Sequence, residues 1–432
     1  MSSRNTRTRP APRPAEPPGV PARRAALRLL DAVLRRGLAL ESELEAAAGK
    51  LAPSDRGLAH AIAAEALRRL PDLDALIDSA TARPLPHDAK ARSALRIALV
   101  QALALGTPPH AAISTVLPLV DGGPRKLVHG VFGTLMRSGA ALPEVPTLPP
   151  AAAERWEAAW GDSMVGESAR AIAAPPPLDL SLRDPADTAA IEALGGESLM
   201  PGHVRLPAGA SVPDLPGYVQ GAWWVQDLAA SLPARLLGPG AGKALDLCAA
   251  PGGKTLQLAA AGWEVTSVDS SESRLARLAE NLCRTGLSAE VIAADLRSWE
   301  PGAAADAVLL DAPCSATGIF RRHPDVLHRV RPALVAEMAA LQRLLLARAA
   351  RWVRPGGRLV FATCSLEPME GEEQIEAFLA ENQDFTLDPP SSDAMPAGVG
   401  IDPRGWLRIL PGMLAGQGGL DGFFIAPLVR VR

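Results

Sequence analysis

Residues 243–255, KALDLCAAPGGKT, indicate the fold more strongly than any other stretch. The apolar strand pattern KALDL runs directly into a loop of small residues, and the helical pattern TLQLAAAG follows that loop. A strand, a turn of small residues and a helix in this order let backbone N–H groups and the helix N-terminus approach a ligand. The residues that we expect to form this ligand-binding loop are Cys248, Ala249, Ala250, Pro251, Gly252, Gly253 and Lys254.

The alternation of strand and helix continues toward the C-terminus. The strand patterns EVTSVDS, AEVIAADL, DAVLLDAP and GRLVFATCS alternate with the helical pattern SRLARLAENLCRTG and with a long helix near 332–352. Such alternation predicts a mostly parallel sheet with helices on both faces. We therefore expect residues 236–432 to form a Rossmann-like α/β domain.

Acidic residues mark the ends of the expected strands. Asp269 comes 23 residues after Asp246, the placement of a carboxylate that bonds a ribose diol, and the next two strands end at Asp295 and Asp311. This pattern predicts an adenosine-bearing cofactor. The loop is neither the GxGxxG of a nicotinamide site nor the GxxxxGK[ST] of a triphosphate site, which Lys254-Thr255 resembles only superficially. Spacing alone thus makes S-adenosylmethionine the favoured candidate.

The four cysteines are expected to be free thiols. Cys248, Cys283, Cys314 and Cys364 form neither a disulfide-rich pattern nor a CxxC pair for zinc, and we expect no metal site. Cys283 stands in a helical pattern, where a cysteine is expected to be a small buried side chain. Cys314 and Cys364 stand at strand ends with Pro or Thr before and Ser after them, and these positions favour a functional role.

The residues before the α/β domain divide into four segments. Residues 1–20 are rich in proline and poor in apolar residues, which predicts a disordered arm. Apolar residues at helical spacing over 21–140 predict an all-helical domain, and the proline-rich stretch 141–152 predicts a linker. We expect residues 151–235 to form a small α+β subdomain with a helix at 151–172 and strands at 178–183 and 203–207.

The overall composition excludes a membrane protein. Of the 432 residues 48% are hydrophobic and 21% charged, and no apolar run reaches the ~18 residues that span a bilayer. No apolar run of signal-peptide type follows the first ten residues, so we expect a cytoplasmic protein. Residues 1–140 carry 20 Lys+Arg against 12 Asp+Glu, whereas the remainder carries 24 against 35. The N-terminal part therefore favours a polyanionic partner.

Three motifs closely resemble the RNA cytosine-5 methyltransferases of the Sun, or RsmB/NOP, family. They are DLCAAPGGKT (246–255), LLDAPCSATGIFRRHPD (309–325) and FATCSLEPMEGEEQIEAFL (361–379). Residues 24–137 look like the NusB-type helical RNA-binding domain that precedes the catalytic domain in the bacterial 16S ribosomal RNA enzyme. The resemblance covers essentially the whole chain and implies a class I S-adenosylmethionine-dependent methyltransferase behind a NusB-like domain.

The resemblance also implies roles for individual residues. Cys248 to Lys254, Asp269, Asp295 and Asp311 match the positions that bind S-adenosylmethionine in the family. Cys364 matches the thiol that adds to C6 of the cytosine, and Cys314 matches the thiol that assists the later elimination. Asp311 would also bond the N3 and N4 edge of the base.

The chemistry explains why a thiol is needed. Cytosine C5 is a poor nucleophile, so its methylation needs a transient bond at C6, and a thiolate can both attack and leave. The target base must also leave its stack, which is easiest in single-stranded or distorted RNA. Arg321, Arg322 and His323 follow the Pro-Cys loop, and we expect them to project over the cleft and contact phosphate or base.

Three hypotheses follow for the function. The first is a cytosine-5 methyltransferase of 16S ribosomal RNA, and the second is the same enzyme acting on transfer RNA or another structured RNA. The third is a non-catalytic NusB-like RNA-binding or assembly factor, against which the intact Cys364 and Cys314 argue. In each case the expected partner is RNA and not DNA, and a monomer is the favoured state.

Overall fold

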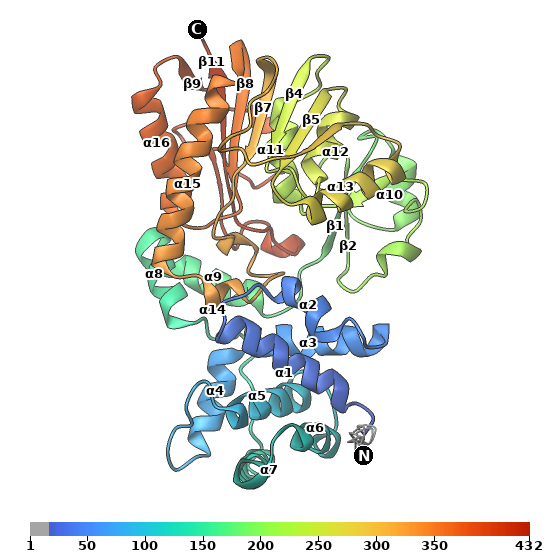
Figure 1. Ribbon diagram of the computed structural model, residues 1–432, viewed down its shortest axis with the longest axis vertical. Coiled ribbons are helices and arrows are strands. Elements are labelled where there is room, and N and C mark those ends of the chain that lie inside the picture. Colours follow the sequence, from blue (N-terminus) through green and yellow to red (C-terminus); the bar gives the residue numbers. More distant parts are fainter. Residues whose placement is uncertain (1–16) are drawn as a thin grey trace, which may run out of the picture. The chain divides into compact units, whose positions relative to one another are not determined.

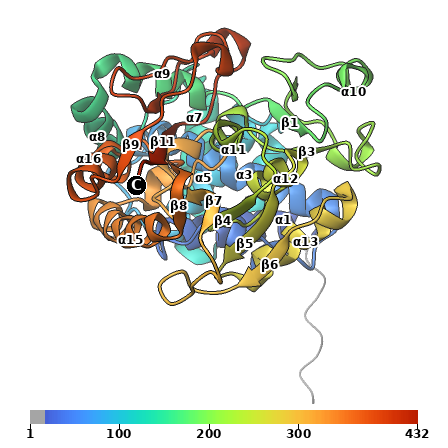
Figure 2. The same ribbon diagram turned by 90° about the horizontal axis from the view of Figure 1, so that it is seen from above.

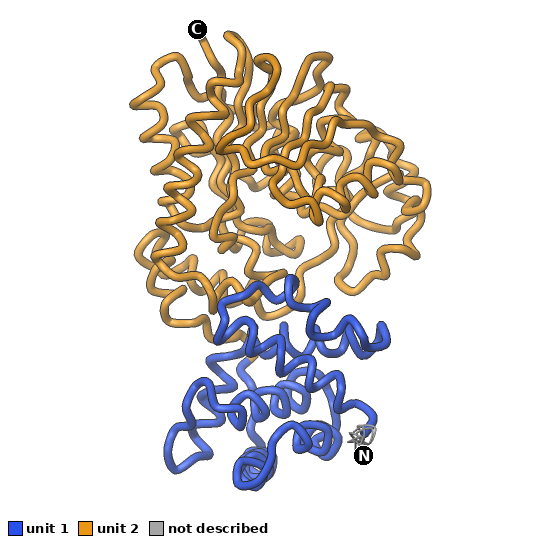
Figure 3. The backbone as a smooth tube through the Cα atoms, viewed as in Figure 1, with its two compact units in different colours: residues 1–143 blue, residues 144–432 orange. Residues whose placement is uncertain are grey.

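The computed structural model describes residues 17–432, and the chain forms two compact units, residues 1–143 and 144–432 (Figure 3). Residues 1–16, which make up most of the expected arm, lie outside the described residues. Val20, the last residue of that expected arm, already begins the first helix. Within residues 17–432, no helix combines the length and hydropathy that crossing a bilayer requires.

Over its described residues, 17–143, unit 1 forms helices and no strand, as its apolar spacing predicts. Prolines stand in the first turns of α1, α3, α4 and α6. At these positions a backbone N–H has no partner within the helix, so a proline, which lacks the N–H, costs no hydrogen bond. Leu29, Leu30, Ile62, Leu67 and Leu99 are among the fully buried side chains of its core. The helices are α1 (Val20–Leu34), α2 (Leu40–Ala48), α3 (Pro53–Arg68), α4 (Leu70–Ser79), α5 (Lys90–Leu103), α6 (Pro109–Val116) and α7 (Gly122–Arg137), with the 3-10 turn η1 (Leu117–Leu119).

Unit 2 is built on an eight-stranded sheet in the order β10-β11-β8-β7-β4-β5-β6, with β9 also paired to β11 (Figure 1). The strands are β4 (Lys243–Leu247), β5 (Glu264–Asp269), β6 (Glu290–Ala293), β7 (Ala305–Asp311), β8 (Val353–Thr363), β9 (Phe385–Leu387), β10 (Leu407–Ile409) and β11 (Phe423–Arg430). The five strands from β4 to β8 pair in parallel, and the last three pair antiparallel. The predicted mostly parallel α/β sheet is therefore confirmed.

Helices cover both faces of this sheet (Figure 2). Along β7, Val308 and Leu310 pack in the core under α15 and α16, whereas Ala307 and Leu309 pack in the core under α11 and α12. This alternation is the period-two pattern of a strand buried on both sides. The helices are α11 (Leu228–Leu237), α12 (Gly253–Ala260), α13 (Glu272–Thr285), α14 (Val326–Arg329), α15 (Pro332–Arg351) and α16 (Glu372–Glu381), with the 3-10 turns η3 (Thr317–Ile319), η4 (Pro368–Glu370), η5 (Ser392–Ala394) and η6 (Ala415–Gln417).

The segment before β4 differs in two respects from its prediction. The helix expected at 151–172 is two helices, α8 (Pro150–Trp160) and α9 (Asp162–Ile172), because Gly161 has a φ of 84° and breaks the hydrogen-bond ladder. Its small antiparallel sheet, β2-β1-β3, contains the two expected strands and a third. The elements are β1 (Leu178–Leu182), α10 (Thr188–Leu194), β2 (His203–Leu206), the turn η2 (Val212–Asp214) and β3 (Trp223–Val225).

Candidate active site

The carboxyl ends of β4, β7 and β8 lie side by side at one edge of the large sheet. The strand order reverses at β4, because the chain continues from β4 to β5 on one side and later to β7 on the other side. A reversal of strand order of this kind opens a crevice in which α/β proteins bind their ligands. The loops after these three strands carry Cys248 to Gly252, Cys314 and Cys364, whereas Asp269 ends β5 and Asp295 follows β6.

The loop after β4 depends on glycine. Gly252 has a φ of 108° and precedes α12, and a Cβ on it would lie 2.3 Å from Cδ1 of Leu278. Cys248 also has a positive φ, of 60°. The first turn of α12 has no side-chain cap, so its N–H groups remain available to a ligand. Burial raises the pKa of the Cys248 thiol, which therefore stays protonated at neutral pH.

Asp269 ties the end of β5 to this loop. Its Oδ2 accepts from the backbone N–H of Ala250 at 3.2 Å, and its Oδ1 accepts from that of Ser271 at 2.8 Å. Nη2 of Arg274 lies 2.9 Å and 3.0 Å from the two carboxylate oxygens. Because the side chain of Arg274 is half exposed, it can leave Asp269 when a ligand hydroxyl competes for the carboxylate.

Asp246 lies beneath the loop, inside β4. It is fully buried, and its Oδ2 accepts from the Thr255 hydroxyl at 2.5 Å, whereas its Oδ1 has no hydrogen-bond partner. Burial raises the pKa of Asp246 to about 7. The protonated carboxyl supplies a donor on that oxygen at neutral pH and below.

Asp295 lies farther out than the pattern predicts. β6 ends at Ala293, so Asp295 follows the strand instead of ending it, and its side chain is partly exposed. Hydrogen bonds from Arg297, with Nη2 2.6 Å from Oδ2, lower the pKa of Asp295 to about 2. The carboxylate is therefore charged at any physiological pH.

Asp311 at the end of β7 pairs with Lys254. Nζ of Lys254 lies 2.7 Å from Oδ2 of Asp311 and 5.5 Å from the centre of the Phe423 ring. Burial alone would lower the pKa of Lys254, but the charges of Asp311 and Asp246 outweigh it and raise the pKa. Lys254 thus stays charged although it is almost fully buried, a pairing that the sequence does not predict.

The two candidate thiols are in contact. Sγ of Cys314, after β7, lies 3.5 Å from Sγ of Cys364, after β8, and both side chains are partly exposed. The hydrogen bond to Cys364 and burial together raise the pKa of Cys314 well above its usual value. Cys314 is therefore a protonated thiol that can donate its S–H toward Cys364. Across residues 17–432, no three His, Cys, Asp or Glu side chains gather in a way that could hold a metal ion.

A buried carboxylate that the sequence gives no reason to single out lies behind both thiols. Glu370 in η4 is fully buried and accepts hydrogen bonds from Ser315 and Ser365, the residues that follow the two cysteines. The repeated Cys-Ser pair was the available signal for this contact.

Arg321 and Arg322 do not project over the cleft as expected. Nη2 of Arg321 donates to the carbonyl of Gly418 at 2.6 Å, and the side chain is buried. Arg322 donates to Asp421 at 3.0 Å and to Asp227 at 2.8 Å. Both guanidinium groups thus hold loops of unit 2 together, and we propose no phosphate contact for them.

His323 lies on the turn after η3 and is half-buried, so its contact with RNA stays a prediction.

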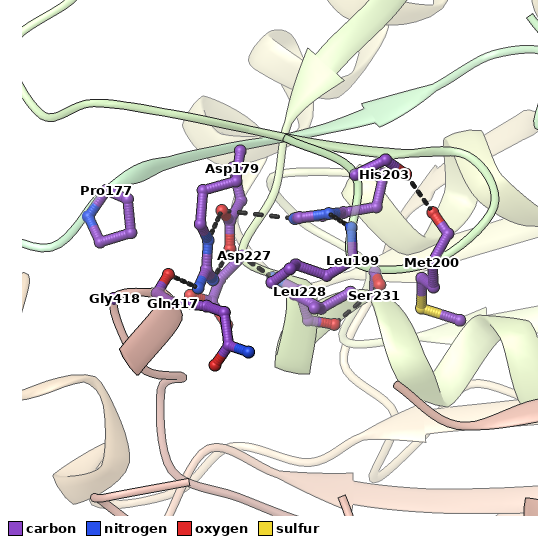
Figure 4. Close-up of polar contacts among 12 residues, drawn as sticks. Pro177, Asp179, Leu199, Met200, His203, Asp227, Leu228, Ser231, Gln417 and Gly418 are labelled. Carbon is purple, nitrogen blue, oxygen red and sulfur yellow. Dashed lines mark hydrogen bonds and ion pairs between the residues drawn. The ribbon is translucent and has the colours of Figure 1, made fainter. Parts of the chain in front are cut away.

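A second buried ion pair attaches the small sheet to the C-terminal part of unit 2 (Figure 4). Nε and Nη2 of Arg205 each lie 2.7 Å from an oxygen of Asp179, and Nε2 of His203 lies 3.3 Å from the same carboxylate. Burial alone would raise the pKa of Asp179, but these two partners hold it well below its usual value. Arg205 also donates to the carbonyl of Gln417 at 2.7 Å, so β2 is connected to η6.

Comparison with known families matches both units. Residues 235–429 match the model described as 16S rRNA methyltransferase RsmB/F, and residues 20–134 match the NusB family. The chain is 37% identical over 442 aligned residues to ribosomal RNA small subunit methyltransferase B of Xylella fastidiosa strain Temecula1, covering 95% of this chain and 98% of the relative. It is 36% identical to the protein of the same name from Pseudomonas syringae pv. tomato, with coverage of 95% and 97%.

Solved structures share the fold. The crystal structure of PH0851 superposes with a TM-score of 0.71 at 23% identity, covering 96% of this chain and 99% of that chain. NSun6 from Pyrococcus horikoshii with SFG gives a TM-score of 0.58 at 19% identity, covering 66% and 99%. At these identities the likeness is one of fold.

Proposed function

The chain belongs to the RsmB/F family of 16S rRNA methyltransferases, and from this premise we propose that it methylates C5 of a cytosine in 16S rRNA through a covalent bond between Cys364 and C6. The methyl donor in this proposal is S-adenosylmethionine. The observation that carries the proposal is the contact of the Cys364 and Cys314 sulfurs at 3.5 Å, at the same sheet edge as the Lys254–Asp311 pair.

The residues around the loop after β4 fit such a donor. An adenosine and an amino-acid tail need N–H groups and acceptors. These are offered by the uncapped N-terminus of α12, by the small residues from Cys248 to Gly253 and by the carboxylate of Asp269. Asp295 offers a further charged acceptor beyond β6. When bound, S-adenosylmethionine supplies an electrophilic methyl group on a sulfonium.

Cys364 starts the reaction on the base. Its thiolate adds to C6 of the cytosine, and electron density moves onto C5, which becomes nucleophilic. Asp311 accepts from the N4 amino group, and when it takes up a proton it donates to N3 and supports the charge that develops there. Lys254 keeps the Asp311 side chain in place. After methylation C5 loses its proton, the C5–C6 double bond re-forms and Cys364 leaves.

Cys314 serves the second half of the reaction. In the free enzyme it is a protonated thiol in contact with Cys364. Once the sulfur of Cys364 is bonded to carbon, that sulfur carries no charge, and Cys314 no longer faces a thiolate. Its own proton is then lost more readily, so Cys314 can assist removal of the C5 proton and release of the product.

Unit 1 is proposed to bring the RNA to the site. The 20 basic against 12 acidic residues of 1–140 attract a polyanion without regard to its sequence, and this attraction weakens with salt. We propose that the enzyme acts on RNA in the cytoplasm as a monomer.

Release of tritium from C5-labelled cytosine tests the chemistry. With 16S rRNA and S-adenosylmethionine, the wild type is expected to release tritium and Cys364→Ala is expected to release none. Bisulfite mapping of total RNA with and without the protein tests the substrate. If 5-methylcytosine is lost from transfer RNA and not from 16S rRNA, transfer RNA is the substrate. Calorimetry that shows no binding of S-adenosylmethionine would favour an assembly factor instead.

A further inference from the structure

Glu370 is a buried carboxylate that the proposed reaction does not use. Its side chain is fully buried, and the hydrogen bonds to it come from neutral groups. The Ser365 hydroxyl lies 2.5 Å from Oε2, the backbone N–H of Ser315 lies 2.8 Å from Oε1, and Nε2 of Gln342 lies 3.2 Å from Oε1. The Ser315 hydroxyl also donates to Oε2.

A charged group in this position is costly for the fold. Burial raises the pKa of Glu370, although the hydrogen bonds from Ser315 and Ser365 oppose that shift. An apolar side chain would fill the same space without the cost of burying a carboxylate. Packing alone therefore does not explain why a carboxylate with these hydrogen-bond donors occupies this position.

The donors connect the two cysteine loops. Ser315 follows Cys314 after β7, and Ser365 follows Cys364 after β8, so one carboxylate holds the neighbour of each thiol. Gln342 of α15 adds a bond from its Nε2 to the carbonyl of Pro313 at 2.8 Å. The loops also meet directly, through the Ser315 and Ser365 hydroxyls at 3.3 Å and through the Gly318 N–H, which donates to the Cys364 carbonyl at 2.9 Å. Glu370 accepts from both serines and therefore fixes how these hydroxyls are oriented.

We propose that Glu370 is a positioning residue that keeps the sulfurs of Cys314 and Cys364 in contact. Its side chain is fully buried, and it acts through Ser315 and Ser365. Its importance for methyl transfer rests on the proposed function, because only there must Cys314 reach the base while Cys364 is bonded to it. Its effect on the distance between the thiols does not rest on that reaction.

Formation of a disulfide between the two cysteines measures this distance without RNA or cofactor. With the azo oxidant diamide, each thiol gives up its proton and one electron, an S–S bond forms, and diamide is reduced to the corresponding hydrazine. The sulfurs need to approach from 3.5 Å to about 2.05 Å, which a small rotation achieves when the loops are held in place. The rate is followed by alkylating the remaining thiols under denaturing conditions and measuring the peptides by mass spectrometry.

Three variants of the full chain are compared with the wild type. Glu370→Ala is expected to slow disulfide formation by about tenfold, because each serine loses its acceptor. Glu370→Gln is expected to be intermediate, since its amide oxygen still accepts from one serine. Glu367→Gln is the matched control, because this buried glutamate of the same turn accepts from Trp156 and Arg155 and not from the serines. It is expected to oxidise at the wild-type rate.

Kinetics with RNA provide the second measurement. Glu370→Ala is expected to lower kcat and leave the KM for S-adenosylmethionine unchanged, and Glu370→Gln is expected to restore part of kcat. Equal oxidation rates in wild type and Glu370→Ala, or an equal slowing in Glu367→Gln, would overturn the proposal. If Glu370→Ala does not fold, Ser365→Ala and Glu370→Gln decide by the same criteria. A wild type that oxidises as expected but does not methylate cytosine would refute the proposed function alone.

Discussion

The Nζ atom of Lys254 lies 2.7 Å from Oδ2 of Asp311, and this ion pair joins the first turn of α12 to the end of β7. Lys254→Met removes the charge and keeps much of the length of the side chain. Loss of one preorganised charged donor costs about 10²- to 10³-fold in kcat, and we expect methyl transfer with saturating 16S rRNA to slow by about that factor. Lys243→Met, at the exposed start of β4, is the matched control. An unchanged kcat in Lys254→Met would contradict a catalytic role for the pair.

The contact between the thiols makes a prediction about pH. The hydrogen bond to Cys364 is the largest cause of the raised pKa of Cys314, so Cys364→Ala should lower that pKa. Alkylation of Cys314 by iodoacetamide, followed peptide by peptide from neutral to alkaline pH, should then reach its midpoint at a lower pH. Cys283→Ala changes a distant exposed thiol and should leave the midpoint unchanged. A midpoint that does not move in Cys364→Ala would show that burial alone raises the pKa.

The proposed division of labour predicts a trapped intermediate. Cys314→Ala removes the group that assists elimination, so the covalent bond between Cys364 and the RNA should persist. A denaturing gel of this variant with 16S rRNA and S-adenosylmethionine should show a retarded band. The same band should be absent from Cys364→Ala and from the double variant. Absence from Cys314→Ala itself would assign the elimination to another group.

Asp246 predicts how stability depends on pH. Burial raises its pKa to about 7, whereas an aspartate in the unfolded chain titrates near about 3.9. The folded state therefore binds the proton more tightly, and this stabilisation is lost as the pH rises from about 4 to 7. Asp246→Asn does not titrate, so its thermal midpoint should fall less than that of the wild type across this window. Asp421, whose pKa burial also raises to about 7, titrates in both proteins and serves as the common background. Parallel curves for the two proteins would contradict the prediction.

A close backbone approach makes Gly318 intolerant of a side chain. A Cβ on Gly318 would lie 2.0 Å from the carbonyl oxygen of Gly422, whose own N–H donates to Gly318 at 2.8 Å. Gly318→Ala must displace one of these loops, at a cost of about 1–3 kcal/mol in the free energy of unfolding, and should lower kcat because Gly318 also bonds Cys364. Gly416→Ala, with open space around it, should change neither quantity. Chemical denaturation and the tritium-release assay measure both.

The sequence predicts those parts of the fold that depend on local pattern. The strands at 178–183 and 203–207 appear as β1 and β2, because their apolar residues face a buried side of the small sheet. β3 was missed, since three residues with two adjacent tryptophans show no alternation. Cys283 was expected to be buried, but it lies on the exposed side of α13. One residue in a helical pattern can face either way.

The sequence predicts those residues of the candidate site that lie at the carboxyl ends of parallel strands. Asp311, Cys314 and Cys364 meet at one edge because β7 and β8 are parallel neighbours. The direction of Arg322 could not be predicted, because its partners Asp227 and Asp421 lie 95 and 99 residues away in the chain. Long charged side chains follow their tertiary partners and not their sequence neighbours.

The position of β11 has a consequence for protein synthesis. This strand, Phe423–Arg430, lies between β8 and β10, and Thr363, the residue before Cys364, pairs with Phe424. Until residues 423–430 have been synthesised, β8 is an edge strand, and Cys364 lacks the neighbouring strand β11. The part of the sheet beside Cys364 is therefore complete only after residues 423–430 have left the ribosome.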